Sequence, residues 1–253
     1  MTDPQPTAPQ RAVMPAHAAR RLLELEAETR FTLKDGRIAS EAPPDNAPGP
    51  LLYMAGGRIW VDETVAPPLL DQLSRLARHE TPGSEALSPA SLDRCLALLP
   101  RAGTPSGGLS YLLPHGTQAP GAARMIASGS AEAENLEARF EREGMPRHLL
   151  DLNFRQVADL WPPYCLVVED GDVAALAFTA RRGSRGAELG LVTLPAFRGR
   201  GLAGQAVAGW SALPELRELT LFYSTAATNL ASQRVAAKLG LPFIGSTWEV
   251  ARA

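Results

Sequence analysis

The sequence predicts an α/β protein with a mixed central sheet, and two features of its C-terminal half carry that prediction. Two strand patterns, 188–194 and 219–224, are each followed by a helical pattern, over 201–210 and 230–239. A helix that follows a strand returns the chain to the same end of the sheet, so these two strands are expected to run parallel. Upstream, two apolar runs within 164–179 flank an Asp-Gly dipeptide, which predicts an antiparallel hairpin beside them.

The N-terminal part of the chain alternates short helical and extended patterns. Leucines at helical spacing predict amphipathic helices, and apolar pairs around Asp-Gly or Gly-Gly dipeptides predict short hairpins. The stretch 40–50 is proline-rich and has no periodicity, so we expect a loop there. In chain order we expect a helix over 16–29, two extended pieces over 31–38, a hairpin over 51–61, and helices over 67–79 and 91–99.

The stretch 101–122 is rich in Gly, Pro, Ser and Thr and contains one short apolar run, over 109–113. Such a composition is typical of a connection between domains. We therefore divide the chain into a disordered tail (1–14), a smaller N-terminal α/β region (15–122) and a C-terminal domain (123–253).

The rest of the C-terminal domain has weaker patterns. Charged and apolar residues recur at helical spacing over 131–143, which predicts a helix, and 149–160 is expected to be another helix, ended by Pro162 and Pro163. The arginine-rich stretch 181–185 is expected to be a polar connection, and 243–250 is expected to be the last strand.

Composition excludes several classes of protein. Hydrophobic residues make up 45% and charged residues 21%, and the formal net charge is −2, so no global basic field attracts nucleic acid or an anionic membrane. No apolar stretch approaches the roughly 20 residues that a membrane-spanning helix needs. Met1 to Gln10 lacks the apolar core of a signal peptide. We expect a cytoplasmic protein, monomeric or homodimeric, that binds neither nucleic acid nor membrane.

A metal site is not expected. Cys95 and Cys165 have no metal-ligand spacing, and the four histidines are scattered without an H-x-x-H or H-E-x-x-H pattern. We interpret both cysteines as buried small hydrophobic residues in a reducing compartment.

The segment 192–204 carries the chemical signal. A strand ends, a proline-containing turn follows, and Gly199 and Gly201 open a helix with Arg198 and Arg200 beside them. The first backbone N–H groups of a helix have no partner within it, and the helix dipole adds partial positive charge there. Such a helix start suits a pyrophosphate.

Two of the three ligands that could use this helix start fit poorly. Gly199, Gly201 and Gly204 match the dinucleotide pattern G-x-G-x-x-G, but only about 50 residues follow and the next strand ends Tyr-Ser-Thr, without the expected carboxylate. A nucleoside triphosphate loop is excluded because Gly-Lys-Ser/Thr is missing.

The third ligand is coenzyme A. Residues 198–203 read Arg-Gly-Arg-Gly-Leu-Ala and fit the signature R/Q-x-x-G-x-G/A, directly after a strand and turn. Residues 229–241 begin with Asn, have Ser three residues on, and end Lys-Leu-Gly-Leu; 25 residues, room for a helix and a strand, separate them from Ala203. Two signatures in this order make the chain, over about 125–253, resemble the GCN5-related N-acetyltransferases (GNAT).

The resemblance implies the GNAT fold, in which two central parallel strands splay, helices flank the sheet, and acetyl-CoA lies in the gap as cosubstrate. The strand end offers backbone groups to the pantetheine arm and acetyl carbonyl, and the loop cradles the pyrophosphate. The N-terminal region is then either a degenerate GNAT-like half or a lid over the acceptor site. The implied cofactor-binding residues are Leu191, Val192, Thr193, Arg198, Gly199, Arg200, Gly201, Leu202, Ala203, Asn229 and Ser232.

Acyl transfer to an amine requires that the amine lose a proton, because an alkylamine with a pKa near ~10.4 is protonated at neutral pH. Glu188 is the candidate general base, on the same strand face as Gly190 and Val192. A strand N–H near Val192 would stabilise the oxyanion. The alternative for Glu188 is a solvated strand residue or the partner of an arginine.

The departing thiolate needs a proton or a positive environment. Many family members have a tyrosine seven residues after the helix asparagine, where this chain has Ala236. Tyr223, Ser224 or Ser232 could replace it, or water could protonate a thiolate whose thiol pKa is near ~8.5. Asn229 has the alternative role of a helix N-cap.

These expectations favour an N-acetyltransferase that acts on a primary amine of a small molecule or a protein. A catalytically inactive acyl-CoA-binding regulatory module is the alternative, and the missing tyrosine favours it slightly. A hydride-transfer enzyme is a distant third.

Overall fold

A computed structural model describes residues 14–78, 89–99 and 102–253 of the 253-residue chain. Most of the predicted tail 1–14, and the predicted end of a helix at His79, lie outside the described residues. The helices are α1 (Ala16–Arg30), α2 (Pro67–Ala77), α3 (Leu92–Leu98), α4 (Ala131–Glu143), α5 (Arg147–Leu150), α6 (Leu202–Ser211) and α7 (Leu230–Lys238), with short 3₁₀ helices η1 (Val157–Leu160), η2 (Pro195–Phe197) and η3 (Pro214–Leu216). The strands are β1 (Phe31–Lys34), β2 (Arg37–Glu41), β3 (Leu52–Ala55), β4 (Arg58–Val61), β5 (Ala102–Leu113), β6 (Arg124–Ala127), β7 (Tyr164–Glu169), β8 (Asp172–Arg182), β9 (Gly186–Thr193), β10 (Thr220–Ala226) and β11 (Phe243–Arg252).

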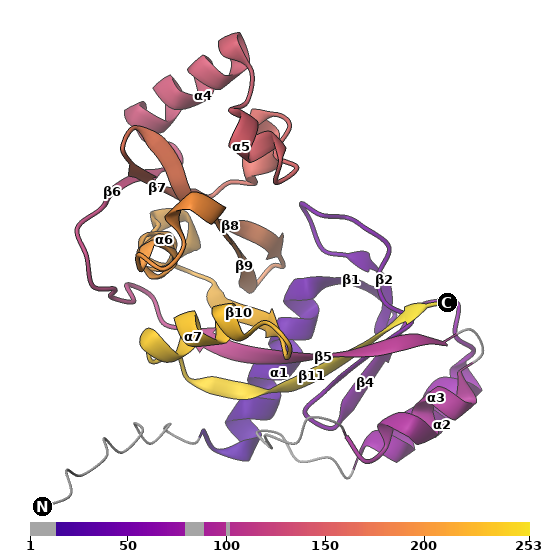
Figure 1. Cartoon of the computed structure of the whole chain (residues 1–253). Helices are drawn as coiled ribbons and strands as arrows, with labels where there is room; N and C mark the ends of the chain where they lie inside the picture. The colour runs from indigo at the N-terminus through magenta and orange to yellow at the C-terminus, as the bar shows by residue number, and fades with distance from the viewer. Residues whose placement is uncertain (1–13, 79–88, 100–101) are drawn as a thin grey trace, which may run out of the picture.

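In the described part of the chain, nine strands form one mixed sheet in the order β4-β3-β11-β5-β10-β9-β8-β7-β6, and β1 and β2 form a separate hairpin (Figure 1). The pair β9–β10 is parallel and every other neighbouring pair is antiparallel. The α/β fold class, with its parallel pair beside an antiparallel hairpin, is confirmed.

The predicted connection over 101–122 is wrong in its first part, because residues 102–113 form the long strand β5. β5 lies between β11 and β10, near the middle of the sheet. β5 contains glycines, which are typical of loops, because two of its positions lie too close to β11 for a side chain. A Cβ at Gly107 would crowd the ring of Trp248, and one at Gly108 would crowd the hydroxyl of Thr247.

Strands from both sides of the predicted domain boundary alternate in this sheet. β3 and β4 pair on the outer edge of β11, and β5 separates β11 from β10. The division of the chain at residue 122 remains a prediction, and it would separate strands that are hydrogen-bonded neighbours.

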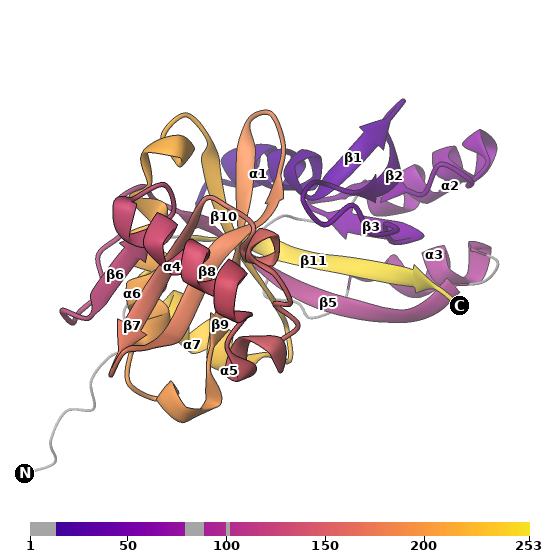
Figure 2. The ribbon, with the colours of Figure 1, turned by 90° about the horizontal axis from the view of Figure 1, so that it is seen from above.

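Helices cover both faces of the sheet. α1 lies on one face, and α6 and α7 lie on the other (Figures 1 and 2). Side chains on the first face, such as Phe222, pack against α1, and those on the second, such as Leu221, pack with α6 and α7. Successive residues of β9 also point to opposite faces of the sheet. Gly186 and Glu188 face α1, whereas Ala187 and Leu189 belong to the core under α6. The helices α4 and α5 lie on the same face as α1 and pack over Leu166, Leu176 and Val192.

Two further elements differ from expectation. The predicted helix over 149–160 is instead α5, a turn and η1, because Asn153 adopts a left-handed backbone (φ 69°) and Gln156 and Asp159 cap the short helix η1. The predicted polar connection over 181–185 begins too early, because β8 continues to Arg182.

The remaining predicted elements are confirmed within a few residues. The Asp35-Gly36 and Asp170-Gly171 turns have the positive φ angles that tight hairpins require. Cys95 and Cys165 are buried, as predicted. Among the helices of residues 14–78, 89–99 and 102–253, none is both long and apolar enough to cross a membrane.

Candidate active site

The central parallel strands pair for three residues and then separate. Gly186, Ala187 and Glu188 of β9 pair with Thr220, Leu221 and Phe222 of β10. Beyond this point β9 remains paired with β8 as far as Thr193, and β10 remains paired with β5 as far as Ala226. The two strands therefore diverge from Glu188 onward, and the β10-facing edge of residues 189–193 has no strand partner in the described part of the chain.

The loop after β9 leads into the N-terminus of α6. Gly201 is the N-cap of α6 in a left-handed conformation (φ 82°), and no side chain of the described residues caps the helix. A Cβ at Gly199 or Gly201 would meet nothing within 4 Å, so the approach to the first backbone N–H groups is open. The first turn contains no acidic residue, and the site therefore fits an anionic pyrophosphate.

The two arginines of this loop are exposed. The Nε of Arg198 donates to the backbone carbonyl of Thr193 at 3.3 Å. Arg200 lies over the ring of Phe197 and pairs with Glu169 at 3.0 Å. Both guanidinium groups can reorient toward an anion, because each has only exposed or partly exposed partners.

Asn229 and Ser232, the residues predicted from the signature at 229–241, have different roles in the structure. The side chain of Asn229 accepts from the backbone N–H of Ser232 at 3.1 Å, so Asn229 caps α7, as its alternative role predicted. The hydroxyls of Ser232 and Tyr223 are 2.6 Å apart. Burial raises the pKa of Tyr223 to about 12, so its hydroxyl is suited to donate a hydrogen bond rather than to release a proton.

Ala236, at the position of the usual tyrosine, is fully buried. It belongs to the core under α6 and α7, with Tyr223 among its members. The Tyr223 hydroxyl reaches Ser232 from β10, on the same side of the sheet as α7. Tyr223 and Ser232, two of the predicted substitutes for the missing tyrosine, therefore lie together beside α7.

Glu188 lies at the point of divergence, on the α1 face, and is almost completely buried. Its carboxylate pairs with Arg30 at 3.6 Å and with Arg181 at 3.3 Å, and it accepts a hydrogen bond from Ser224. Burial raises the pKa of Glu188, but Arg30, Arg181 and Ser224 together outweigh this effect and hold the pKa below its ordinary value. Glu188 is therefore the partner of two arginines, as its alternative role predicted. Its role as general base remains a prediction.

Sequence reasoning missed the residues that surround Glu188. Arg30 and Glu26 come from α1, Arg181 from the end of β8, and Glu249 from β11. Only the tertiary structure brings these distant positions together. Glu26 was the available signal, because it follows Leu22 and Leu23 at helical spacing in the 16–29 pattern and a buried charge requires a partner.

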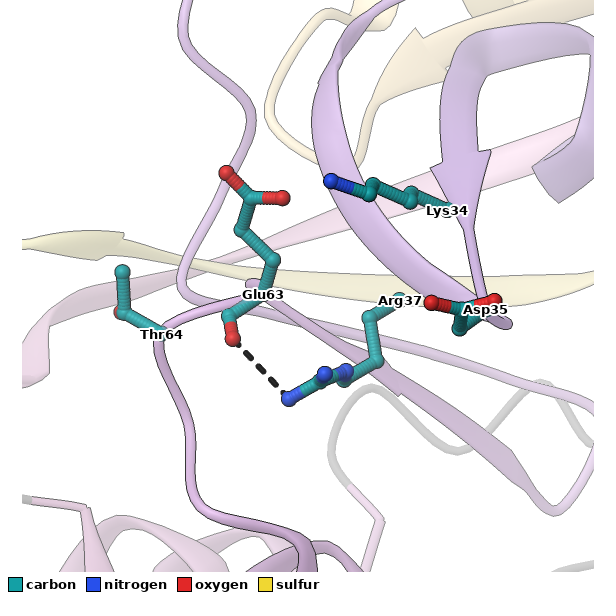
Figure 3. A pocket seen from close by; sticks show the side chains of 5 residues that line it. All are labelled: Lys34, Asp35, Arg37, Glu63 and Thr64. Carbon is teal, nitrogen blue, oxygen red and sulfur yellow. Dashed lines mark hydrogen bonds between the residues drawn. The ribbon is translucent and has the colours of Figure 1, made fainter.

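A shallow pocket lies elsewhere on the surface. It has a volume of about 370 Å³ and is lined by Lys34, Asp35, Arg37, Glu63 and Thr64, where Arg37 donates to the carbonyl of Glu63 at 2.9 Å (Figure 3). None of these residues belongs to the predicted site. In the described ranges, no three His, Cys, Asp or Glu side chains are arranged to hold a metal ion.

Comparisons with known proteins concern both the sequence and the fold. The family model of the acetyltransferase (GNAT) domain matches residues 118–242. A search of curated proteins found no significant match.

Several solved structures are similar in fold. A GNAT-family acetyltransferase from Colwellia psychrerythraea is 15% identical, with 78% of this chain and 76% of that chain covered and a TM-score of 0.42. A GNAT-family protein from Novosphingobium aromaticivorans is 17% identical, with 98% and 99% covered and a TM-score of 0.43. A GCN5-related N-acetyltransferase from Kribbella flavida is 17% identical, with 64% of each chain covered and a TM-score of 0.41.

The family match includes the diverging strands, the glycine loop before α6 and the capped helix α7. Residues 118–242 of this chain belong to the GNAT acetyltransferase domain family.

Proposed function

We propose that the protein is an N-acetyltransferase that transfers the acetyl group of acetyl-CoA to a primary amine. One observation carries the proposal: β9 and β10 diverge directly before the glycine loop that opens α6. The unpaired edge of one strand and an uncapped helix N-terminus then follow one another along the chain, which suits a ligand with an extended amide arm and a pyrophosphate.

The residues fit coenzyme A by charge and by space. The first backbone N–H groups of α6 would hold the pyrophosphate, with Arg198 and Arg200 adding positive charge. The backbone of Leu191, Val192 and Thr193 would bind the pantetheine arm. When bound, acetyl-CoA supplies an acetyl group activated as a thioester.

The chain itself must orient the amine and accept its proton. Glu188 and Ser224 lie on the α1 face at the point of divergence, opposite the face of α6. An ionised carboxylate here favours an ammonium group nearby, and it can accept the proton directly or through water. On the opposite face, Tyr223 and Ser232 offer hydroxyl hydrogen bonds to a departing sulfur.

The cofactor assignment is tested by calorimetric titration of the full chain with acetyl-CoA and with CoA. We expect micromolar binding that is lost in Gly201→Glu, because the new carboxylate repels the pyrophosphate at the helix N-terminus. Gly144→Glu is the matched control: Gly144 also has a positive φ (84°), and a Cβ added there would meet no atom within 4 Å, but it follows α4. Equal loss in both variants, or no binding by the wild type, would contradict the assignment.

Turnover separates the enzyme from the inactive acyl-CoA-binding alternative. Free thiol is measured as CoA is released from acetyl-CoA in the presence of a panel of primary amines. Amine-dependent release that Gly201→Glu abolishes supports acetyl transfer. Tight acetyl-CoA binding without release for any amine in the panel supports the inactive module.

A further inference from the structure

A group of buried and half-buried charges on the α1 face is not required by cofactor binding. Arg30 bridges Glu188 and Glu249, and Arg181 bridges Glu188, Glu41 and Asp45. Glu26, one turn before Arg30 on α1, lies within electrostatic reach of Arg30, Glu188 and Glu249. We call this group the carboxylate cluster; its members are Glu26, Glu41, Asp45, Glu188, Glu249, Arg30 and Arg181.

The deepest part of the carboxylate cluster contains polar atoms that have no hydrogen-bond partner in the described protein. Both carboxyl oxygens of Glu26 and the hydroxyl of Tyr53 are buried and make no hydrogen bond of normal geometry, although the Ser110 hydroxyl lies near enough to lower the pKa of Glu26. The Arg30 Nε makes no hydrogen bond either and has the Glu188 carboxylate as its ionic partner at 3.6 Å. They come from α1 and β3. A buried polar group without a partner is costly, so several such groups in one place indicate a binding function.

The carboxylate cluster has an excess of acidic groups. Among the described residues, its five carboxyl groups face two guanidinium groups. If Glu26 is neutral, four carboxylates and two cations remain. The most deeply buried charges balance, because Glu41 and Glu188 are matched by the two arginines. The excess therefore lies at Glu249 and Asp45, whose side chains are about one third exposed, and carboxylates in this position favour a cation beside them.

The carboxylate cluster reaches from the diverging strands to the surface. Glu188 is at the point where β9 and β10 separate, whereas the side chains of Glu249 and Asp45 are 30% and 29% exposed. The glycine loop of α6 follows β9 on the far face of the sheet. A molecule that enters past Glu249 would therefore approach the divergence from the side opposite the cofactor loop.

We propose that the carboxylate cluster is the acceptor subsite and that it binds an organic dication, a primary amine that carries a second ammonium group. The proposal rests on the proposed acetyl transfer only for the identity of the reacting amine. That amine must lose its proton before it attacks the thioester, so it ends as a neutral group. The second ammonium group keeps its charge and offsets the remaining carboxylate excess.

Glu26 gives the proposal a second, independent readout. Burial raises the pKa of Glu26 to about 8, with Glu188 and Glu249 adding to the rise and Arg30 and Ser110 opposing it, so Glu26 is mostly protonated at pH 7. Tyr53, whose own pKa is raised by burial, also lies near and is neutral. A bound cation favours the ionised form of Glu26, and binding at pH 7 should therefore release a proton.

The test is calorimetric titration of the full chain, with CoA present, using 1,4-diaminobutane as the dication and n-butylamine as the monocation. We expect the dication to bind at least tenfold more tightly than the monocation. We also expect Glu249→Gln to weaken dication binding about tenfold. Glu24→Gln is the matched control, because Glu24 also pairs with one arginine, is 29% exposed and lies outside the carboxylate cluster; it should change binding less than twofold.

Proton release is measured by repeating the titration at pH 7 in two buffers of different ionisation enthalpy. The wild type should release a proton on binding 1,4-diaminobutane, and Glu26→Gln should not. If Glu249→Gln does not fold, Asp45→Asn replaces it, because Asp45 is also partly exposed. Asp45→Asn should weaken the binding of 1,4-diaminobutane severalfold.

The outcomes separate this proposal from the proposed function. CoA binding without amine binding overturns the dication subsite and leaves the cofactor assignment intact. Amine binding without CoA binding supports the subsite and contradicts the acetyltransferase. Equal affinity for both amines, equal losses in Glu249→Gln and Glu24→Gln, or unchanged proton release in Glu26→Gln would each overturn the proposal.

Discussion

At the scale of single residues, the same fold shifts two neighbouring carboxyl groups in opposite directions. Burial dominates at Glu26 and raises its pKa to about 8, whereas two arginines and a hydroxyl outweigh burial at Glu188 and lower its pKa. Glu188 is therefore ionised at neutral pH and Glu26 is mostly protonated. Two acidic groups with separated pKa values are typical of sites that move protons.

The raised pKa of Glu26 predicts that stability falls as pH rises. Below about pH 4.5 the carboxyl is protonated in both states, so it contributes no pH dependence. Between about 4.5 and 8 the unfolded chain loses the proton and the folded protein keeps it, so the free energy of unfolding falls by about 1.4 kcal/mol per pH unit from this group. Above about 8 the contribution is constant.

Urea unfolding of the wild type and Glu26→Gln at pH 5, 6.5 and 8 measures this effect. Glutamine does not titrate, so the variant should gain stability relative to the wild type as pH rises from 5 to 8. A constant difference across the three pH values would show that Glu26 is ionised in the folded protein.

At the scale of elements, the docking of α1 on the sheet positions the carboxylate cluster. α1 crosses the sheet from the β3–β4 turn, where Arg20 donates to the carbonyl of Gly56 at 3.1 Å, to the β8–β9 turn beside Glu28. Its close approach to β9 depends on Gly186, because a Cβ there would collide with the hydroxyl of Thr29. A small residue at the start of β9 thus fixes where Glu26 and Arg30 lie.

Gly186→Ala should displace α1 and destabilise the protein by about 1–3 kcal/mol, the usual cost of overpacking a close contact. Gly204→Ala is the control, because a Cβ at Gly204 would make ordinary contacts of 3.6 and 3.7 Å; its stability should change by less than about 1 kcal/mol. Thermal unfolding measures both variants. Equal stability of the two would mean that α1 adjusts to the extra methyl group without cost.

At the scale of the whole molecule, one strand joins the two predicted parts of the chain. β5 precedes the segment 118–242 that matches the family, yet it is hydrogen-bonded to β10 on one side and β11 on the other. Without β5, β10 loses its antiparallel neighbour and β11 loses its connection to the sheet. The N-terminal region is therefore part of the same sheet as the cofactor signature.

Residues 123–253 expressed alone should lack a cooperative unfolding transition, because the sheet would be interrupted at β5. Co-expression with residues 1–122 as a separate chain should restore the transition, which circular dichroism during heating can follow. A cooperative transition of residues 123–253 alone would show that β5 is dispensable and would support the predicted domain boundary.

The sequence by itself determined the elements whose signals are local. The glycines and arginines of 198–201, the asparagine cap of α7 and the Asp-Gly hairpin turns depend on backbone geometry within a few residues, so they can be read directly. The family resemblance depends on the first two of these signals together.

Tertiary structure decided the rest, because burial and pairing depend on residues far apart in the chain. β5 is a central strand because it pairs with β10 and β11, and its glycines leave room for Trp248 and Thr247 of β11. Glu188 became the partner of Arg30 and Arg181 because α1 and β8 bring those arginines to β9. The sequence shows that these charges exist, but only the fold places an excess of carboxylates beside the diverging strands.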